Sequence, residues 1–194
     1  QTNLRAGQEA LGQFAHHEAV AFLEQAHRAA QHVGRDSEVA LLESLGEACA
    51  RSGRSDDAIV YLERALAVTK AAVHRSRLRA RLGWIHLSRS DLGHARGELE
   101  QGFSEIGSRL PKSGPFDWLL TLLQWGWGLA LGLLGSKVAT TSETRRERLK
   151  ALSQLYDLAS MVAYFGLDGP VLIQAGLRAP AIAHRIGPSR QMAN

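Results

Sequence analysis

Residues 46–65 read GEACARSGRSDDAIVYLERA, and four of their positions recur at fixed spacing elsewhere in the chain. Here Gly46 is followed by Ala58, Leu62 and Ala65, at offsets of 12, 4 and 3 residues. Two further sets have the same offsets: Gly7, Ala19, Leu23 and Ala26, and Gly83, Ala95, Leu99 and Gly102. Small residues let two antiparallel helices approach closely, and a leucine one turn on fills the space beside them. The three sets therefore predict an array of helical hairpins, a kind of fold that usually binds a partner.

The composition favours helices and a packed core. The chain has 194 residues, of which 45% are hydrophobic, and β-branched residues are sparse. Cys49 is the only cysteine, so no internal disulfide can form and a cytoplasmic location fits best. The formal net charge of +4 is spread along the chain, apart from a basic run at residues 145–150, which disfavours nucleic acid as the partner.

Apolar periodicity and turn residues predict the helices. The predicted ranges are residues 3–15, 16–32, 37–52, 55–73, 75–89, 91–106, 116–135, 143–165 and 171–186. Gly53 is expected to end the third helix and Ser55 to cap the fourth. Thr140 and Glu143 have the spacing of a capping box, and Pro180 is expected to kink the last helix.

These elements predict an all-α chain in three parts. Residues 1–106 contain the three helical-hairpin repeats. Residues 107–141 contain a loop and an inserted apolar helix that is rich in tryptophan and glycine. Residues 142–194 form a degenerate fourth hairpin and the start of a further helix, because the small-residue pattern is only partly kept there.

The apolar helix at 116–135 is the most unusual segment, since residues 118–135 carry no charge. Gln124 and two central tryptophans favour a helix that is buried or covered by a partner, with a membrane segment as the alternative. An exposed apolar face here predicts a homo-oligomer. The residues that we expect to form an interaction surface are Trp118, Trp125, Trp127 and Leu129, together with the basic residues Arg145, Arg146 and Arg148.

No motif for catalysis or cofactor binding stands out. Residues 132–137 resemble a phosphate loop only superficially, because Ser136 separates the glycine from the lysine. The histidines are scattered, and His17-Glu18 lacks the second histidine of a zinc-protease helix. We expect His86 to pack against the partner helix and Cys49 to be an inert core thiol. The sequence therefore predicts no catalytic, cofactor-binding or metal-binding residue.

The repeated pattern resembles the tetratricopeptide repeat. Hairpins of that family have small residues at the matching positions and a large apolar residue where Leu23, Leu62 and Leu99 stand. Gly53 falls on the turn glycine of the family. The separations of 39 and 37 residues between Ala19, Ala58 and Ala95 exceed the usual period of about 34. The resemblance implies a solenoid of hairpins that carry longer helices or loops than the standard repeat.

A closer resemblance concerns residues 10–26, ALGQFAHHEAVAFLEQA, and residues 162–189. Both are similar to the helical region behind the ATPase module of large bacterial signalling ATPases of the STAND or AAA-like type. Those proteins often carry an adenylate cyclase or protein kinase domain. The chain departs from that family at His184, where an acidic residue is common, and at Pro180.

The second resemblance implies a scaffold or sensor within a larger ATP-dependent regulator. Its partner would be another protein or other domains of the parent chain. The resemblance brings no catalytic residues, because the nucleotide-binding and cyclase modules would lie outside these residues. The alternative is a self-association or membrane-apposed module that uses the apolar helix at 116–135.

Overall fold

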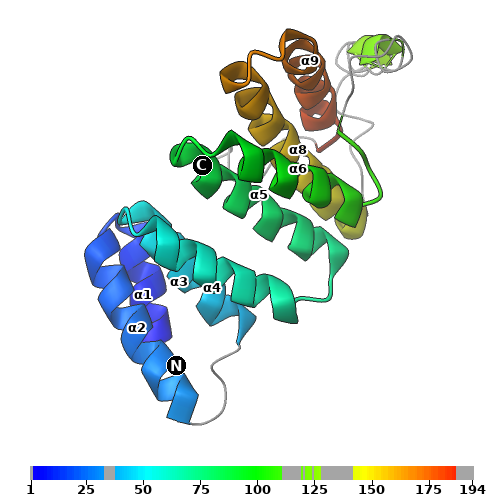
Figure 1. Cartoon of the computed structure of the whole chain (residues 1–194). Coiled ribbons are helices and arrows are strands. Elements are labelled where there is room, and N and C mark those ends of the chain that lie inside the picture. Colours follow the sequence, from blue (N-terminus) through cyan, green and yellow to red (C-terminus); the bar gives the residue numbers. More distant parts are fainter. Residues whose placement is uncertain are drawn as a thin grey trace. The chain divides into compact units, whose positions relative to one another are not determined.

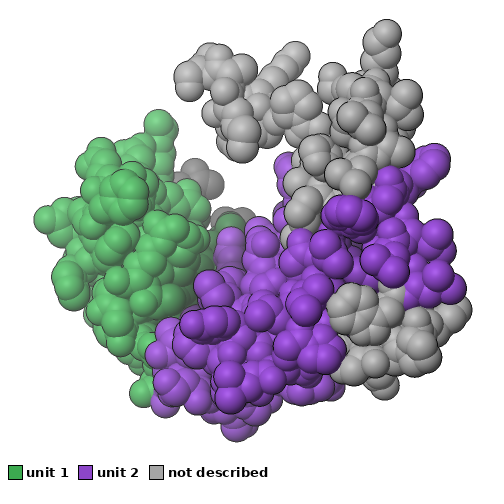
Figure 2. Space-filling view, turned by 90° about the horizontal axis from the view of Figure 1, so that it is seen from above, with its two compact units in different colours: residues 1–71 green, residues 72–194 purple. Residues whose placement is uncertain are grey.

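Helices make up all the regular secondary structure in the residues that the computed structural model describes, which are 2–32, 38–110, 119, 121–123, 125–127 and 142–186. The chain therefore has the all-α helical-repeat fold that its sequence predicts (Figure 1). Its contacts divide it into two compact units, residues 1–71 and residues 72–194, shown in green and purple in Figure 2. The three predicted hairpins are thus shared between two units.

The first unit is built from two helical hairpins. α1 (Thr2–Gly12) pairs with α2 (His16–His32), and α3 (Val39–Arg51) pairs with α4 (Ser55–Val68). α3 also packs against both helices of the first hairpin. The facing sides enclose small and branched apolar residues, which form the core: Ala19, Leu23, Leu41, Leu42, Leu45, Ala48, Cys49, Ala58, Leu62 and Ala65.

The second unit also contains two hairpins. α5 (Ala72–Ser88) pairs with α6 (Leu92–Glu105), and α8 (Glu143–Phe165) pairs with α9 (Gly169–Ile186). α8 packs against α5 and α6 as well as α9, so it joins the two hairpins. The core that results includes Leu87, Leu99, Phe103, Ile106, Leu155, Tyr156, Leu158 and Ala175. In this core the ring of Phe103 on α6 and the ring of Tyr156 on α8 meet edge to face, with centroids 5.1 Å apart.

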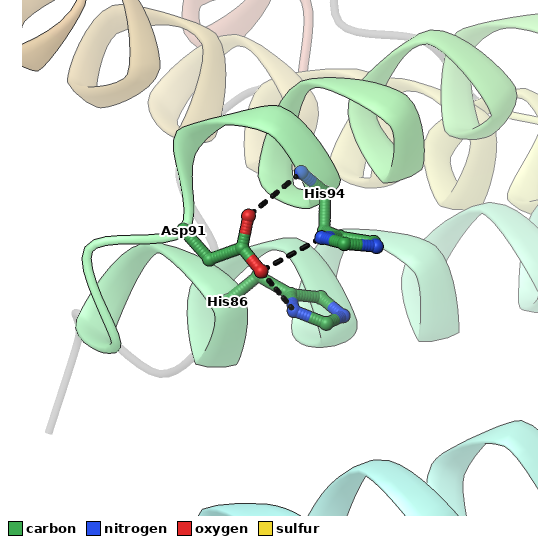
Figure 3. A group of neighbouring side chains, drawn as sticks. All are labelled: His86, Asp91 and His94. Atoms are coloured by element: carbon green, nitrogen blue, oxygen red, sulfur yellow. Dashed lines mark hydrogen bonds and ion pairs between the residues drawn. The ribbon is translucent and has the colours of Figure 1, made fainter.

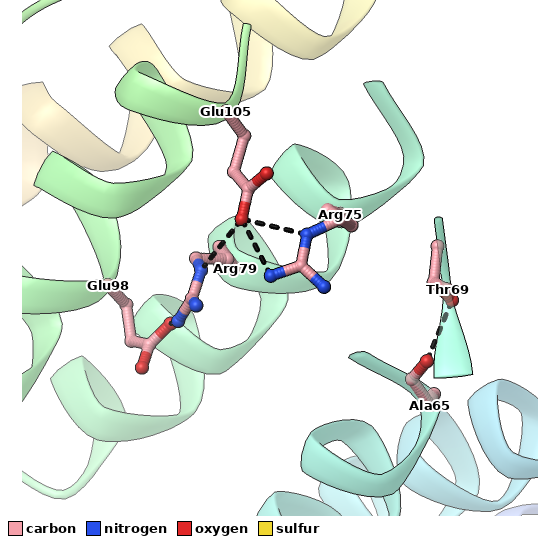
Figure 4. A network of polar contacts seen from close by, with 6 residues as sticks. All are labelled: Ala65, Thr69, Arg75, Arg79, Glu98 and Glu105. Carbon is pink, nitrogen blue, oxygen red and sulfur yellow. Dashed lines mark hydrogen bonds and ion pairs between the residues drawn. The ribbon is translucent and has the colours of Figure 1, made fainter. Parts of the chain in front are cut away.

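Ion pairs between α5 and α6 hold the third hairpin from outside (Figure 4). Arg75 Nη2 lies 2.8 Å from Glu105 Oε1, and Arg79 Nη1 lies 2.9 Å from Glu98 Oε2. These four side chains are 15–27% exposed, so their attraction is screened less than on an open surface. The hydrogen bond from Arg75 holds the pKa of the Glu105 carboxyl below its usual value.

A residue with left-handed backbone stands in the turn of each hairpin. The predicted turn at Gly53 is confirmed by its φ of +82°. The corresponding residues of the other turns are Phe14, Ser90 and Leu167, with φ of 60°, 61° and 55°. Only one of the four turns thus has the glycine that this conformation favours.

The predicted end of the fourth helix is wrong. The helix ends at Val68 rather than near residue 73, and α5 begins at Ala72. Thr69 has an extended backbone, with ψ of 125°. Its backbone N–H and its hydroxyl both donate to the Ala65 carbonyl, at 3.0 and 2.7 Å (Figure 4). Because a β-branched residue that bonds back in this way disfavours the next helical turn, the helix stops there.

Two predicted caps also differ from the structure. Arg54, not Ser55, is the N-cap of α4, and its side chain makes no capping hydrogen bond. The Arg54 guanidinium binds Asp57 and Glu24 instead, each at 2.7 Å. α8 begins at Glu143 as predicted, but its N-cap is Ser142, so the predicted capping box is wrong. Thr140 itself lies outside the described residues.

Two further predictions concern the C-terminal half. α9 runs from Gly169 to Ile186 as one helix that includes Pro180. Most of the predicted apolar helix at 116–135 lies outside the described residues, and those that are described are helical: 119, 121–123 and 125–127. Among the described residues, no helix combines the length and the apolar character that crossing a bilayer requires.

Candidate functional site

The small residues of the first two sets lie where the paired helices cross. A Cβ atom added to Gly7 would stand 2.5 Å from Cγ of Leu23, and one added to Gly46 would stand 2.6 Å from Cγ of Leu62. The same Cβ atoms would lie 3.4 Å from the carbonyl oxygens of Ala19 and Ala58. Ala65 is fully buried beside them, and Ala26 is half-buried. Glycine and leucine thus fit one another within each hairpin.

The third set is used differently. A Cβ atom at Gly83 would stand 2.5 Å from Cδ2 of Leu158, and one at Gly102 would stand 2.7 Å from Cδ2 of Leu155. Both leucines belong to α8, which therefore occupies the space that these glycines leave. Ala95 and Leu99 are fully buried in the same core. The small residues of the third hairpin thus receive a helix from outside the hairpin.

The predicted interaction surface is only partly described. Trp118 and Leu129 lie outside the described residues. Trp125 and Trp127 are 43% and 58% exposed. Leucines in the same segment are exposed as well: Leu119, Leu122 and Leu123. Thr121 is fully buried, and its hydroxyl accepts hydrogen bonds from the Arg178 guanidinium at 2.8 and 3.0 Å, which ties this segment to α9.

The predicted basic residues have different surroundings. Arg145 and Arg148 are exposed, whereas Arg146 is half-buried. Arg148 Nη2 donates to the Ile106 carbonyl at 2.8 Å, which places its charge at the C-terminal end of α6, where a cation is favoured. Glu147, within the same run, binds Arg77 of α5. Part of the basic run therefore joins helices together.

A patch of exposed apolar side chains covers the C-terminal end of α8 and the turn that follows. We call it the α8 patch, and it consists of Met161, Tyr164, Phe165 and Leu167, which are 44%, 60%, 58% and 92% exposed. The first three lie on one helical face, and the rings of Tyr164 and Phe165 meet edge to face at 5.2 Å. Single exposed apolar residues are common, but four of them within seven residues of sequence make a candidate interaction site.

A cavity of about 130 Å³ lies between α6 and the turn from α8 to α9. Its walls are mainly apolar: Leu92, Leu99, Leu110, Val162, Ala163 and Val171. Arg96 and Asp168 supply charge at its lining, and Asp168 is adjacent in sequence to Leu167 of the α8 patch. A cavity of about 150 Å³ can hold a benzene molecule, so this one has room for one apolar side chain. The cavity and the α8 patch together form the candidate interaction site.

Three side chains with metal-binding atoms meet at the turn from α5 to α6 (Figure 3). His86, Asp91 and His94 each bring one such atom within 4.8 Å of the other two. The sequence predicts no metal site here, because its spacing does not reveal that a turn brings the three side chains together. His86 stands near the end of one helix, Asp91 caps the next, and His94 lies in its first turn. A search for two histidines four residues apart does not find this arrangement.

Cys49 is fully buried, as the sequence predicts for a core thiol. Burial raises the pKa of the Cys49 thiol to about 11, so the thiolate that acts as a nucleophile is scarce at neutral pH. This residue has neither the exposure nor the ionisation of a catalytic cysteine.

Comparison with known proteins identifies the repeat in the first unit. Residues 5–71 match the family model of the tetratricopeptide repeat, which covers all but the first residues of the two hairpins α1–α2 and α3–α4. Searches of curated proteins and of solved structures gave no significant match. Residues 5–71 are therefore similar to a tetratricopeptide-repeat region.

Proposed function

We propose that the chain is a non-catalytic helical-repeat scaffold or sensor that binds a protein partner within a larger ATP-dependent signalling regulator. Tetratricopeptide repeats generally mediate protein–protein interaction, which supports the scaffold role. The observation that carries the proposal is the α8 patch, with Leu167 92% exposed at its end. Such a surface loses unfavourable contact with water when a partner covers it.

The geometry favours an apolar segment of a folded partner or of another domain of the parent chain. Tyr164 and Phe165 supply large rigid rings, the residue class that dominates binding energy at interfaces. The cavity beside the turn can take one apolar side chain of the partner, and Arg96 and Asp168 can bond polar groups next to it. This combination of an apolar centre with a polar margin is typical of protein interfaces.

The regulator context rests on the resemblance of residues 10–26 and 162–189 to the helical region of bacterial signalling ATPases. In that context the chain acts in the bacterial cytoplasm and transmits the binding of a partner to an ATPase module. The coding sequence on either side of this chain tests the idea. A nucleotide-binding module upstream supports it, and flanking sequence without such a module contradicts it.

The interaction site itself can be tested with a displayed peptide library. Peptides are selected on the immobilised chain, and their affinities are then measured for the wild type and for the double variant Tyr164→Ser/Phe165→Ser. Both side chains are exposed, so the substitutions should change stability by less than about 0.5 kcal/mol. We expect the double variant to weaken binding at least about tenfold, because two aromatic anchors are lost.

The matched control is Val60→Ser on α4, an exposed apolar residue of the first unit, at 47% exposure. This variant should bind the selected peptides with unchanged affinity. Equal binding by the wild type and the double variant would show that the α8 patch is not the interaction site. A selection without any enriched peptide would contradict the proposed protein-binding function.

A second candidate function is self-association through the apolar helix at 116–135. The observation that favours it is the exposure of Trp125 and Trp127, at 43% and 58%. Light scattering of the chain over a range of concentrations measures its mass directly. A mass that rises with concentration in the wild type, and less so in Trp125→Ser/Trp127→Ser, supports self-association. A monomer at all concentrations excludes it.

A further inference from the structure

The turn between α5 and α6 gathers two imidazoles around one carboxylate. Asp91 Oδ2 lies 2.7 Å from His94 Nδ1 and 3.9 Å from His86 Nδ1. The two rings are stacked, with centroids 5.2 Å apart and an angle of 22° between their planes. Figure 3 shows that both rings turn a nitrogen towards the carboxylate, so three ligating atoms face a common space.

The backbone of the turn fixes this arrangement. Ser90 has the left-handed φ of 61°, and the N–H of Asp91 donates to the His86 carbonyl at 2.9 Å. The Asp91 carboxylate then divides its two oxygens between two roles. Oδ1 accepts the backbone N–H of His94 at 3.1 Å, as an N-cap does, which leaves Oδ2 to face both imidazoles. The helix cap therefore orients the carboxylate before any ligand arrives.

We propose that His86, Asp91 and His94 bind a divalent transition-metal ion of the Zn²⁺ class. Neutral imidazole suits Zn²⁺, Cu²⁺ and Ni²⁺, and one carboxylate with two histidines is an established ligand combination for such ions. Harder cations such as Mg²⁺ prefer oxygen ligands and are disfavoured here. The inference is independent of the proposed protein-binding function, and it concerns a part of the chain that the α8 patch does not use.

The rearrangement that binding needs is small for the two atom pairs that include the carboxylate oxygen. With bonds of about 2.0 Å, two ligands of a tetrahedral ion lie about 3.3 Å apart. The nitrogen of His94 must therefore move away from the carboxylate oxygen by about 0.6 Å, and that of His86 must approach it by about 0.6 Å. The side chain of His94 is 75% exposed, so its ring can rotate, whereas the hydrogen bond from the His94 N–H to Oδ1 holds the Asp91 carboxylate in place. His86 is 14% exposed and acts as the fixed ligand.

The same exposure determines what completes the coordination shell. Three protein ligands leave at least one position open on a tetrahedral ion. Because the site lies at an exposed hairpin turn, water can fill that position, or a side chain of a partner can replace the water. A bound ion would link the end of α5 to the start of α6 and hold their turn closed.

Zinc binding to the full chain without a polyhistidine tag tests the proposal. Competition with a chromophoric chelator measures the affinity for Zn²⁺, and the absorption of bound Co²⁺ reports the ligand geometry. The key variants are His94→Ala, which removes an exposed side chain, and Asp91→Asn, which keeps a good helix cap but loses the charge. His17→Ala, at an exposed histidine of α2, is the matched control.

We expect one Zn²⁺ per chain and no detectable Mg²⁺ binding at the same concentration. Each key variant should lose at least about tenfold in affinity, since loss of even an outer-shell partner typically costs 10–100-fold. Long-range ¹H–¹⁵N spectra should show Zn²⁺-dependent shifts at His86 and His94, with none at His17. No Zn²⁺ binding in the micromolar range would overturn the proposal. Equal affinity in the wild type, the two key variants and the control would also overturn it.

Discussion

Replacement of Gly46 by alanine tests the close helix contact on which the hairpin depends. The added Cβ would lie 2.6 Å from Cγ and 2.7 Å from Cδ2 of Leu62. Ordinary contacts between carbon atoms are about 3.5–4.0 Å long, so each overlap is about 1 Å. Leu62 is buried, and its Cγ is bonded directly to its own Cβ. This atom therefore cannot move aside as the end of a long side chain can. We therefore expect Gly46→Ala to destabilise the first unit.

The magnitude follows from two opposing effects. Overpacking of a dense core typically costs about 1–3 kcal/mol. Alanine is better than glycine within a helix by about 0.5–1 kcal/mol. The expected net destabilisation is therefore between about 0 and 2.5 kcal/mol, with its centre at about 1 kcal/mol. Gly97, within α6, has no atom within 4 Å of an added Cβ, so Gly97→Ala should instead stabilise its helix by about 0.5–1 kcal/mol.

A double-mutant cycle separates the clash from other effects. Leu62→Ala alone should cost about 2–5 kcal/mol, because the side chain is 1% exposed. In that background Gly46→Ala has no leucine to meet and should be neutral or slightly stabilising. The coupling energy between the two sites should therefore be about 1–3 kcal/mol, the overpacking cost that disappears with the leucine.

Amide hydrogen exchange in α3 and α4 is the suitable assay, since it measures the opening free energy of the first unit separately from the second. Stabilisation of these helices by Gly46→Ala, as of α6 by Gly97→Ala, would contradict the close contact between Gly46 and Leu62. An equal cost of Gly46→Ala with and without Leu62 would contradict it as well.

Three further predictions concern other parts of the fold. Gly53→Ala should destabilise the chain by about 1–2 kcal/mol in urea unfolding, because the φ of +82° strains a residue with a Cβ even though the surrounding space is open. Since the Arg75 hydrogen bond lowers the pKa of Glu105, the pair stabilises the fold above the usual glutamate value of 4.5 and loses this effect as the pH falls through the lowered pKa. Urea unfolding between neutral and acidic pH should therefore show a smaller loss of stability in Glu105→Gln than in the wild type, and equal losses would contradict the pairing. Finally, Cys49 should react slowly with a thiol reagent at pH 8 in the folded chain and rapidly in urea, because its thiol is buried with a pKa of about 11, and rapid reaction in the folded chain would contradict that burial.

The sequence is sufficient to predict that α1–α6, α8 and α9 are helices and how they pair within hairpins, although not every helix end. The pattern around Gly46 and Leu62 specifies a contact between helices that are joined by a short turn, so spacing alone locates both partners. The repeat spacing indicates where the turns lie even where the residue type in the turn does not. Phe14, Gly53 and Ser90, all left-handed, are separated by the same 39 and 37 residues that separate the repeated alanines. Only Gly53 could be identified from its chemistry.

Contacts between hairpins could not be predicted in this way. Gly83 belongs to the repeated pattern, yet the side chain nearest to its open side is Leu158, 75 residues further along the chain. The small-residue pattern indicates that another helix packs closely against Gly83, but it does not indicate which helix. The end of α4 differs from the prediction for another reason: the hydrogen bond of Thr69 back to Ala65 is local, and apolar periodicity does not report it.

The candidate sites were the least predictable part, and the physics of the fold explains why. Residues at packing positions must have a given size, small or large, in a fixed order. Their sizes therefore form a periodic pattern in the sequence. Exposed positions such as Tyr164 and His94 are free of that constraint, and any residue there satisfies the fold equally well. Their identity therefore carries information about function rather than about structure, but this information can be interpreted only when the turn or helix end that gathers them is known. In this chain two turns have this role: one places the exposed Leu167 two residues beyond the aromatic residues of α8, and another brings two imidazoles to one carboxylate. If both proposals hold, the regular helices serve chiefly to position the turns, and it is at the turns that closely related chains should differ in what they bind.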